Sequence, residues 1–423
     1  MSSWGNSVMY SMFIRNQGGG FREAEKRLES VRALGTDILW LLPVHPIGKQ
    51  SRKGTLGSPY AIMDYRRINP EYGTMEDFQH FVEHAHALGM KVIIDVVFHH
   101  TSPDSALATT HPEWFYHRPD GSFGNHVGDW SDIIDLEFAN KGLWDELTDT
   151  LCMWAQWVDG FRCDVAPLVP VAFWQQARQA VEKVREKAFW LAESVEPAFI
   201  RELCAMGEIA HSDEELYQAF DVLYDYDLSE TFYGYFQGKC SLQSHISAVA
   251  EQENRYPDGY LKLRFLENHD RMRSAELIPD EHQRMNWLAF SFFQRGIPLI
   301  YAGQECAATH CPSLFDSDPI PTQEDPATVS MIHAMTGLRK MPEFNHGRYS
   351  VRPAGNACAL VEWKSEERTL TGLFCLANEA GRTAVNLRDG LYRNLITGSD
   401  IPVSQGTVDH ALLPAVFEGD TVL

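Results

Sequence analysis

Gly160-Phe161-Arg162-Cys163-Asp164, entered through residues 157–159, is the stretch that decides the fold. If this run is a short buried strand, alternation places Arg162 and Asp164 on one face and Phe161 and Cys163 on the other. Burying a charged group costs several kcal/mol even after relaxation, so charges at the end of an apolar strand indicate chemistry. A structural ion pair explains this stretch equally well when it is taken alone.

The 423-residue chain has an ordinary globular composition, with 44% hydrophobic and 22% charged residues. Its length allows two or three domains, or one barrel with an appendage. The 58 acidic and 36 basic residues give a formal net charge of -22. Because no run of Lys and Arg stands out against this charge, we do not expect a nucleic acid or an anionic membrane as a partner. A neutral or cationic ligand fits better.

Signals of cellular location are few. No apolar stretch approaches the roughly 20 residues of a membrane helix, and residues 1–6 lack the basic and apolar regions of a secretory signal. The eight cysteines stand singly, without the C-x-x-C pair that would suggest zinc or a redox motif. Several lie in apolar strand-like runs, among them Cys163, Cys358 and Cys375. We therefore expect a cytoplasmic protein with reduced cysteines; the sequence does not indicate its oligomeric state.

Apolar runs alternate with amphipathic helical patterns along most of the chain. The predicted strands are 8–14, 37–42, 91–97, 158–164, 189–193, 220–223, 262–266 and 297–301. The predicted helices are 21–33, 74–88, 141–157, 171–187, 198–206, 228–253, 280–295 and 327–340, with Thr74 as an N-cap. About eight such pairs predict a closed (β/α)8 barrel. No glycine-rich loop follows the first strand, which argues against an open dinucleotide-binding sheet.

Two further segments complete the predicted organisation. The connection 98–140 is long and rich in His, Trp, Gly, Asp and Pro, and we interpret it as a short excursion over the barrel mouth. After the barrel, short runs separated by turn residues predict a small antiparallel β-sandwich; they are 349–351, 358–363, 370–376, 383–387 and 391–396. The predicted domains are therefore a catalytic barrel, 1–343, and a C-terminal β-domain, 344–423.

Polar side chains gather where the predicted barrel strands end, which is where barrel enzymes place their active sites. They are Asp95, His99, His100, Arg162, Asp164, Glu193, Glu267, Asn268, His269 and Asp270. A lone acid at a strand end is more often structural. Carboxylates from four different strands converging on one rim are much harder to explain by structure alone.

These clusters resemble the four motif regions of the α-amylase family of retaining glycoside hydrolases. The motifs are Asp95-Val96-Val97-Phe98-His99-His100, Gly160-Phe161-Arg162-Cys163-Asp164, Leu191-Ala192-Glu193 and Phe265-Leu266-Glu267-Asn268-His269-Asp270. Further similarity lies in 59–65, 134–137 and 301–305. The resemblance covers about residues 8–340 in the family's order and spacing. It implies a (β/α)8 barrel, often followed by a C-terminal β-domain, that acts on carbohydrate.

Cleaving a glycosidic bond with retention needs one carboxylate to attack the anomeric carbon and a protonated one about 5 Å away. Asp164 suits the nucleophile, because Arg162 on the same strand face favours its ionised form. Glu193 suits the acid/base, because the apolar residues 189–192 before it favour a retained proton. The family assignment agrees with both roles.

The resemblance adds further roles. It implies that Asp270 is the third carboxylate, which binds sugar hydroxyls and stabilises the positively charged transition state. It implies that His100 and His269 bind hydroxyls of the sugar being cleaved, and that Tyr60 stacks on its ring. Arg162 is grouped with these three as a substrate-binding residue. Without this context, a lone His after a strand is more often structural.

Two departures from the family pattern concern a metal. Many members have Asn at the position of His99 and a His near the position of Leu168, and these help to hold a structural calcium ion. Calcium prefers six to eight oxygen ligands, which neither side chain supplies. We therefore expect no bound metal or cofactor and no calcium site of the usual kind. A metal at His99 and His100 is not expected either, because adjacent strand residues point to opposite faces.

The favoured function is a retaining hydrolase of α-1,4-glucosidic bonds in starch-like glucans or maltooligosaccharides. A transglycosylase, such as a glucanotransferase or maltosyltransferase, shares the covalent intermediate, and the sequence does not separate the two. The short excursion favours a groove open to oligosaccharides. A non-catalytic carbohydrate-binding protein is the remaining alternative, but it predicts a missing acid, whereas Asp164, Glu193 and Asp270 are all present.

Overall fold

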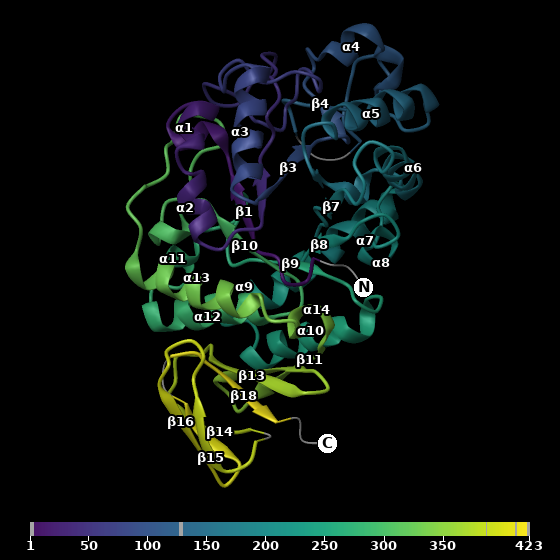
Figure 1. The fold of residues 1–423 in the computed structure, drawn as a ribbon. Helices are drawn as coiled ribbons and strands as arrows, with labels where there is room; N and C mark the ends of the chain where they lie inside the picture. The colour runs from purple at the N-terminus through teal and green to yellow at the C-terminus, as the bar shows by residue number, and fades with distance from the viewer. Residues whose placement is uncertain (1–3, 127–129, 386, 411–412, 421–423) are drawn as a thin grey trace.

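The core of the protein is a closed barrel of eight parallel strands. The computed structural model describes residues 4–126, 130–385, 387–410 and 413–420 (Figure 1). The strands follow one another around the barrel in the order β1-β10-β9-β8-β7-β6-β3-β2. They are β1 (Met9–Met12), β2 (Ile38–Leu41), β3 (Lys91–Val96), β6 (Gly160–Cys163), β7 (Phe189–Ala192), β8 (Val222–Tyr224), β9 (Lys262–Arg264) and β10 (Ile297–Tyr301). Each overlaps a predicted strand, and the predicted (β/α)8 fold is confirmed.

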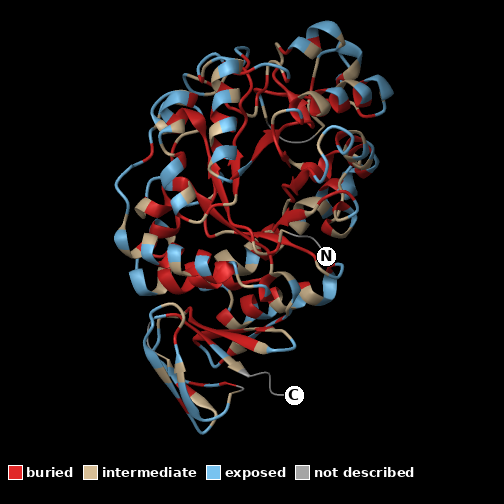
Figure 2. Cartoon of the chain, viewed as in Figure 1, coloured by how far each residue is buried: buried red, intermediate tan, exposed pale blue. Residues whose placement is uncertain are grey.

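Burial explains why these strands read as continuous apolar runs in the sequence. Helices cover the outer face of the barrel and side chains fill its interior, so both faces of each strand are hidden from water. Figure 2 shows the strands buried and the outward faces of the helices exposed. The covering helices are α3 (Met75–Ala87), α5 (Lys141–Trp154), α6 (Val171–Val181), α7 (Pro197–Met206), α12 (Glu281–Phe293) and α13 (Pro326–Arg339).

The ends of several helices follow from local hydrogen bonds. Thr74 is the N-cap of α3, as predicted, and forms a capping box with Asp77: the Asp77 amide donates to Thr74 Oγ1 at 3.2 Å, and the Thr74 amide donates to Asp77 Oδ2 at 2.9 Å. Short helices complete the barrel; they are η1 (Ile14–Gln17), η3 (Ala166–Leu168), α8 (Asp213–Leu216), η4 (Tyr226–Leu228), α11 (Ser274–Leu277) and η5 (Gln304–Cys306). None of the described helices is long and apolar enough to cross a membrane.

Two predicted helices are each broken into two. Residues 228–253 form α9 (Ser229–Phe236) and α10 (Leu242–Arg255), because Gly238 between them has a φ of 68° and Ser241 starts a new helix as an N-cap. Residues 21–33 form α1 (Phe21–Glu25) and α2 (Leu28–Ala33). There the amides of Lys26 and Arg27 donate to carbonyls three residues back, which tightens the turn and interrupts the α-helix.

The predicted excursion after β3 carries little regular structure. It contains β4 (His100–Thr101), α4 (Ala106–Thr110), η2 (Pro112–Trp114) and β5 (Ile134–Asp135), and β4 pairs with β5. Residues 127–129 of this segment lie outside the described part of the chain. In Figure 1 the excursion lies at the opposite end of the view from the C-terminal strands.

The C-terminal residues form two four-stranded antiparallel sheets. One has the order β11-β12-β13-β18 and the other β14-β17-β16-β15. The strands are β11 (Arg348–Ala354), β12 (Cys358–Lys364), β13 (Arg368–Cys375), β14 (Gly381–Ala384), β15 (Gly390–Arg393), β16 (Asp400–Ser404), β17 (Thr407–His410) and β18 (Ala415–Asp420). Leu360 and Leu373 of one sheet and Val403 and Val408 of the other share one apolar core. The predicted antiparallel sandwich is therefore confirmed.

The sandwich packs on the barrel through the sheet that contains β12 and β13. The Trp363 indole donates to the carbonyl of Phe293 at 2.8 Å, and the Gln283 amide group donates to the carbonyl of Leu376 at 2.8 Å. The short helix α14 (Glu343–His346) joins α13 to β11. The exact boundary between residues 343 and 344 stays a prediction, and the predicted strand 383–387 contains residue 386, which lies outside the described residues.

Candidate active site

Arg162 is the centre of the candidate active site. Its buried guanidinium contacts three carboxylates: Nη1 donates to both oxygens of Asp95 at 2.8 and 3.0 Å and to Asp164 Oδ1 at 2.8 Å, and Nη2 lies 3.0 Å from Glu193 Oε1. These acids lie within β3, directly after β6 and directly after β7. The structure thus brings Asp164 and Glu193 together at the carboxyl end of the barrel.

The local fold of β6 explains how Arg162 reaches this position. Gly160 begins the strand where β6 and β7 approach closely: a Cβ added there would lie 2.1 Å from the carbonyl oxygen of Phe189. Alternation then turns Phe161 outward, where its ring packs 5.4 Å from that of Trp190, and turns Arg162 inward. The predicted alternation along this strand is therefore confirmed.

A second group of contacts joins the carboxylates around Arg162. It is made by Tyr60, His269 and Asp270. The Tyr60 hydroxyl lies 2.6 Å from His269 Nε2 and donates to Asp95 Oδ2 at 3.2 Å. His269 Nε2 also lies 3.1 Å from Asp270 Oδ2, and the side chain of Asp270 is 41% exposed. Asp270 therefore faces solvent at the rim, while Tyr60 is half-buried. Tyr60, His269 and Asp270 thus form one chain of contacts with Asp95, and the individual roles of the three stay predictions.

Asp95 was not among the residues predicted to act at the site, although it stood in the strand-end set. It lies opposite Arg162 in the register of β3 and β6, is fully buried, and uses both oxygens on that guanidinium. Trp40 and Tyr224 were also missed: their rings lie 5.3 and 5.4 Å from the Arg162 guanidinium carbon. An acid ending an apolar strand was a usable signal for Asp95, whereas nothing in the local sequence marks the two aromatic residues.

Burial dominates the electrostatics of the mouth. It raises the pKa of Asp164 to about 7, against the opposing pull of Arg162 and with the help of the nearby Asp95 and Asp270 charges. It raises the pKa of Glu193 to about 8, again opposed by Arg162. Arg162 acts on the pKa of Asp164 in the predicted direction, but burial and the neighbouring acids outweigh this effect, because three acids share one cation.

His99 and His100 differ from the sequence expectation. Their Nδ1 atoms lie 3.1 Å apart, so the two rings do not point to opposite faces. The reason is that β3 ends at Val96, and the backbone then turns: the Tyr65 hydroxyl donates to the carbonyl of His100 at 2.7 Å. Both rings are buried, and burial lowers the pKa of each imidazole.

The expected absence of a calcium site near His99 stays a prediction. Asp135 Oδ1 lies 3.8 Å from His99 Nδ1, and both oxygens of Asp135 already accept hydrogen bonds, from Asn125 Nδ2 at 3.3 Å and from the His126 amide at 2.7 Å. Leu168 is a buried apolar residue of η3. His99 therefore presents a ring nitrogen and Leu168 a hydrocarbon side chain, and calcium prefers neither as a ligand.

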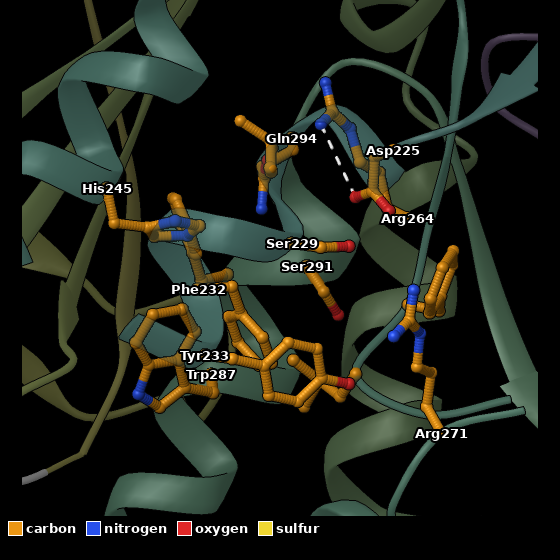
Figure 3. A pocket seen from close by; sticks show the side chains of 14 residues that line it. Asp225, Ser229, Phe232, Tyr233, His245, Arg264, Arg271, Trp287, Ser291 and Gln294 are labelled. Atoms are coloured by element: carbon orange, nitrogen blue, oxygen red, sulfur yellow. Dashed lines mark ion pairs between the residues drawn. The ribbon is translucent and has the colours of Figure 1, made fainter. Parts of the chain in front are cut away.

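A separate small cavity lies beside the barrel. It is enclosed between β9, α9, α10 and α12, and its lining includes Arg264, which faces Asp225 at 3.7 Å (Figure 3). Its volume is about 40 Å³. Pockets for small molecules usually measure about 300 Å³ or more, so this cavity accommodates only water-sized guests. The carboxylates at the mouth remain the candidate active site.

Two family models match most of the chain. A model described as the alpha amylase catalytic domain matches residues 14–113 and 107–336. A model described as the bacterial alpha amylase C-terminal domain matches residues 350–417. The matched regions correspond to the barrel and to the two C-terminal sheets.

Solved structures agree with these matches over the full length. The crystal structure of an alpha-amylase from Lactobacillus plantarum is 44% identical, covers 98% of this chain and 99% of its own, and has a TM-score of 0.95. A maltogenic alpha-amylase from Thermotoga neapolitana is 31% identical, covers 100% of both chains and has a TM-score of 0.89.

One group of sequence relatives carries a different name. The alpha-1,4-glucan:maltose-1-phosphate maltosyltransferase of Myxococcus xanthus is 35% identical over 220 residues, which are 47% of this chain and 32% of that protein. The chain therefore spans about a third of the length of the maltosyltransferases that it matches.

Proposed function

The chain belongs to the alpha-amylase family, and from this membership we propose that it is a retaining glycoside hydrolase that cleaves α-1,4-glucosidic bonds of starch-like glucans or maltooligosaccharides. One observation carries the proposal: a single guanidinium, that of Arg162, contacts both Asp164 and Glu193. An attacking carboxylate and a proton-donating one are the two groups that retention requires.

Asp164 acts as the nucleophile and Glu193 as the acid/base. An Asp164 oxygen attacks the anomeric carbon while Glu193 gives its proton to the leaving glycosidic oxygen, which breaks the C–O bond and forms a glycosyl ester. Glu193 then takes a proton from water, the resulting hydroxide attacks the same carbon, and the ester bond breaks. Burial raises the pKa of Glu193 to about 8, which supports a proton held there for donation, and the Arg162 guanidinium favours the ionised form of Asp164.

The remaining mouth residues bind and orient the sugar. Asp270 accepts hydrogen bonds from sugar hydroxyls and stabilises the positive charge of the transition state. His100 and His269 bind hydroxyls of the same sugar, and the Tyr60 ring stacks on its face. Arg162 holds the two reacting carboxylates in place. The contacts among Tyr60, His269 and Asp270 support a common binding surface.

The same donor set leads us to infer that calcium does not support this protein at the family's usual position. His99 supplies a ring nitrogen where many members have the amide oxygen of Asn, and both oxygens of Asp135 already accept hydrogen bonds. Adding calcium to protein stripped of metal is expected to leave Tm and kcat unchanged. A calcium-dependent rise in either quantity would contradict this inference.

A maltoheptaose digest tests the proposed function. Purified protein should release shorter maltooligosaccharides in the α-anomeric form, read by chromatography and by early-time NMR, and the Asp164→Asn variant should release almost none. A maltosyltransferase or glucanotransferase is the second candidate, favoured by the names of the sequence relatives. Products longer than maltoheptaose would show that the enzyme transfers sugars rather than only hydrolysing them. Products in the β-anomeric form would exclude retention.

A cytoplasmic location is part of the proposal. All eight cysteines are free thiols, which supports a reducing compartment. The net charge of -22 supports a sugar rather than a nucleic acid as the partner. Cell fractionation with a tagged chain would check the location.

A further inference from the structure

Three potential metal ligands meet inside the C-terminal sandwich, far from the barrel mouth. Cys358 and Cys375 face each other directly in the register of β12 and β13, and His410 ends β17 in the opposite sheet. The two sulphur atoms and one imidazole nitrogen all lie within 4.8 Å of one another. Both cysteines are 1% exposed. The three residues, which we call the sandwich cluster, thus connect both sheets.

Apolar packing explains the cysteines but not the histidine. The neighbours of the two thiols are side chains such as Leu360, Leu373 and Phe417, and a buried free cysteine behaves as a small apolar residue there. His410 places a polar ring at the same point, and its Nδ1 atom is buried without a hydrogen-bond partner among the described residues. Leaving a buried polar atom unpaired is costly unless another group satisfies it.

A hydrogen bond fixes the position of one of the thiols. The Cys375 sulphur lies 3.0 Å from the carbonyl oxygen of Glu379, to which its thiol donates. The Cys375 side chain is therefore held beside Cys358 and His410.

We propose that Cys358, Cys375 and His410 bind one zinc-like divalent cation that fastens the two sheets of the sandwich together. Two thiolates and one neutral imidazole are ligands that zinc prefers, with a fourth position for another donor. In a tetrahedral site two sulphur ligands that each lie about 2.3 Å from the ion are about 3.8 Å apart, so the cluster, whose ligand atoms lie within 4.8 Å of one another, closes by at most about 1 Å on binding. Binding releases the two thiol protons to solvent, and the two thiolate charges neutralise the ion, which suits an apolar core.

The site would stabilise the sandwich rather than take part in sugar cleavage. The Cys375 amide donates to Asn286 Oδ1 of α12 at 2.7 Å, so the cluster lies next to the contact between the sandwich and the barrel. An ion that binds only the folded state raises stability by mass action. This inference does not depend on the proposed catalytic activity.

Cobalt(II) is a suitable probe because its bonds to thiolate absorb in the near ultraviolet. The full-length protein, reduced and freed of metal, should bind one equivalent of cobalt with this sulphur-to-metal absorption, and zinc should displace it. The Cys358→Ser and Cys375→Ser variants should lose the absorption, and His410→Ala should weaken cobalt binding at least tenfold. The matched control is Cys204→Ser, which removes an exposed thiol of α7 and should change nothing.

The wild-type protein decides the question even if a buried cysteine variant fails to fold. Absence of the absorption in the wild type would overturn the proposal, and so would its persistence in Cys358→Ser. Recovery of Cys358 and Cys375 as a disulfide from cells with thiols trapped at lysis would also overturn it. A second readout is Tm: excess zinc should raise it in the wild type and Cys204→Ser but not in His410→Ala.

Discussion

Two buried ion clusters on the same barrel differ in a way that separates function from structure. The mouth cluster is Arg162 with Asp95, Asp164 and Glu193. The wall cluster is Lys262 of β9 with Asp213 and Asp227, packed between the barrel and α8, η4 and α10. Each places a fully buried cation among acids on a barrel strand, so burial of charge alone does not distinguish them.

The two clusters differ in the hydrogen bonds and ion pairs that each acid makes. In the wall cluster, Asp227 Oδ2 also accepts from Gln252 Nε2 and from the Tyr256 hydroxyl, each at 2.8 Å. In the wall cluster the pKa of Asp213 is raised by burial, whereas the pKa of Asp227 is lowered, because Lys262 and these hydrogen bonds outweigh the loss of solvent. In the mouth cluster, three acids share one guanidinium and all three pKa values are raised. A buried cluster in which no acid is fully compensated therefore indicates chemistry.

The largest expected difference is in activity. Replacing Asp164 by Asn in the mouth cluster should lower kcat by roughly 10⁴-fold while the protein stays folded, because the amide cannot form the glycosyl ester. Replacing Asp213 by Asn in the wall cluster should leave kcat unchanged and lower the free energy of unfolding by about 1–3 kcal/mol. Kinetics on maltoheptaose and urea unfolding measure both. Equal losses of activity in the two variants would contradict the assignment of the mouth cluster to catalysis and of the wall cluster to stability.

The next expected effect is on the pH dependence of kcat/KM. Catalysis needs Asp164 ionised and Glu193 protonated, so kcat/KM should fall tenfold per pH unit below about 7 and above about 8. The Asp213→Asn variant should keep the same profile, because the wall cluster does not reach the sugar. A kcat/KM that does not fall on either side of this optimum would contradict the assigned protonation states.

The stability of the protein should depend on pH through Glu193 of the mouth cluster. The pKa of Glu193 is raised from about 4.5 to about 8 on folding, so the folded protein keeps a proton that the unfolded chain releases. This contribution to stability is present below about pH 4 and is lost as the pH rises through about 8. The Glu193→Gln variant should therefore gain in Tm over the wild type as the pH rises across this range. A constant difference in Tm would show that Glu193 is not held protonated.

The smallest expected difference comes from a matched pair of tyrosines. Tyr60→Phe removes the hydroxyl between Asp95 and His269, and should lower kcat/KM about tenfold, equivalent to about 1.4 kcal/mol. Tyr256→Phe removes the hydroxyl that donates to Asp213 and Asp227, and should cost about 1–2 kcal/mol of unfolding free energy without changing kcat/KM. The reverse pattern would mean that the two clusters have been assigned the wrong way round.

Much of the barrel could be predicted from the sequence because its signals are local. The strand predicted at 297–301 has the same bounds as β10, and Thr74 caps α3 as its side chain predicts. The break between α9 and α10 was missed, because the helical pattern continues across it, although Gly238 has a positive φ there and Ser241 caps a new helix.

Site features that depend on pairing between strands were harder to predict. In the sequence, Asp95 has no charged neighbour and is typical of a lone structural acid. Only the register of β3 and β6 places it opposite Arg162. The sandwich cluster was not expected, because Cys358 and Cys375 do not form a closely spaced pair in the sequence. Here the register of β12 and β13 joins Cys358 to Cys375, and His410 comes from the other sheet. Such contacts are properties of the assembled sheets rather than of any short stretch.

Trapping the covalent intermediate tests the central claim most directly. A fluorinated glucosyl fluoride, which forms the glycosyl ester faster than water breaks it down, should inactivate the enzyme. Mass spectrometry of the digested protein should then find the sugar on Asp164, the acid that Arg162 holds beside Glu193. A sugar attached to any other residue, or steady turnover of α-glucan by the Asp164→Asn variant, would contradict the account.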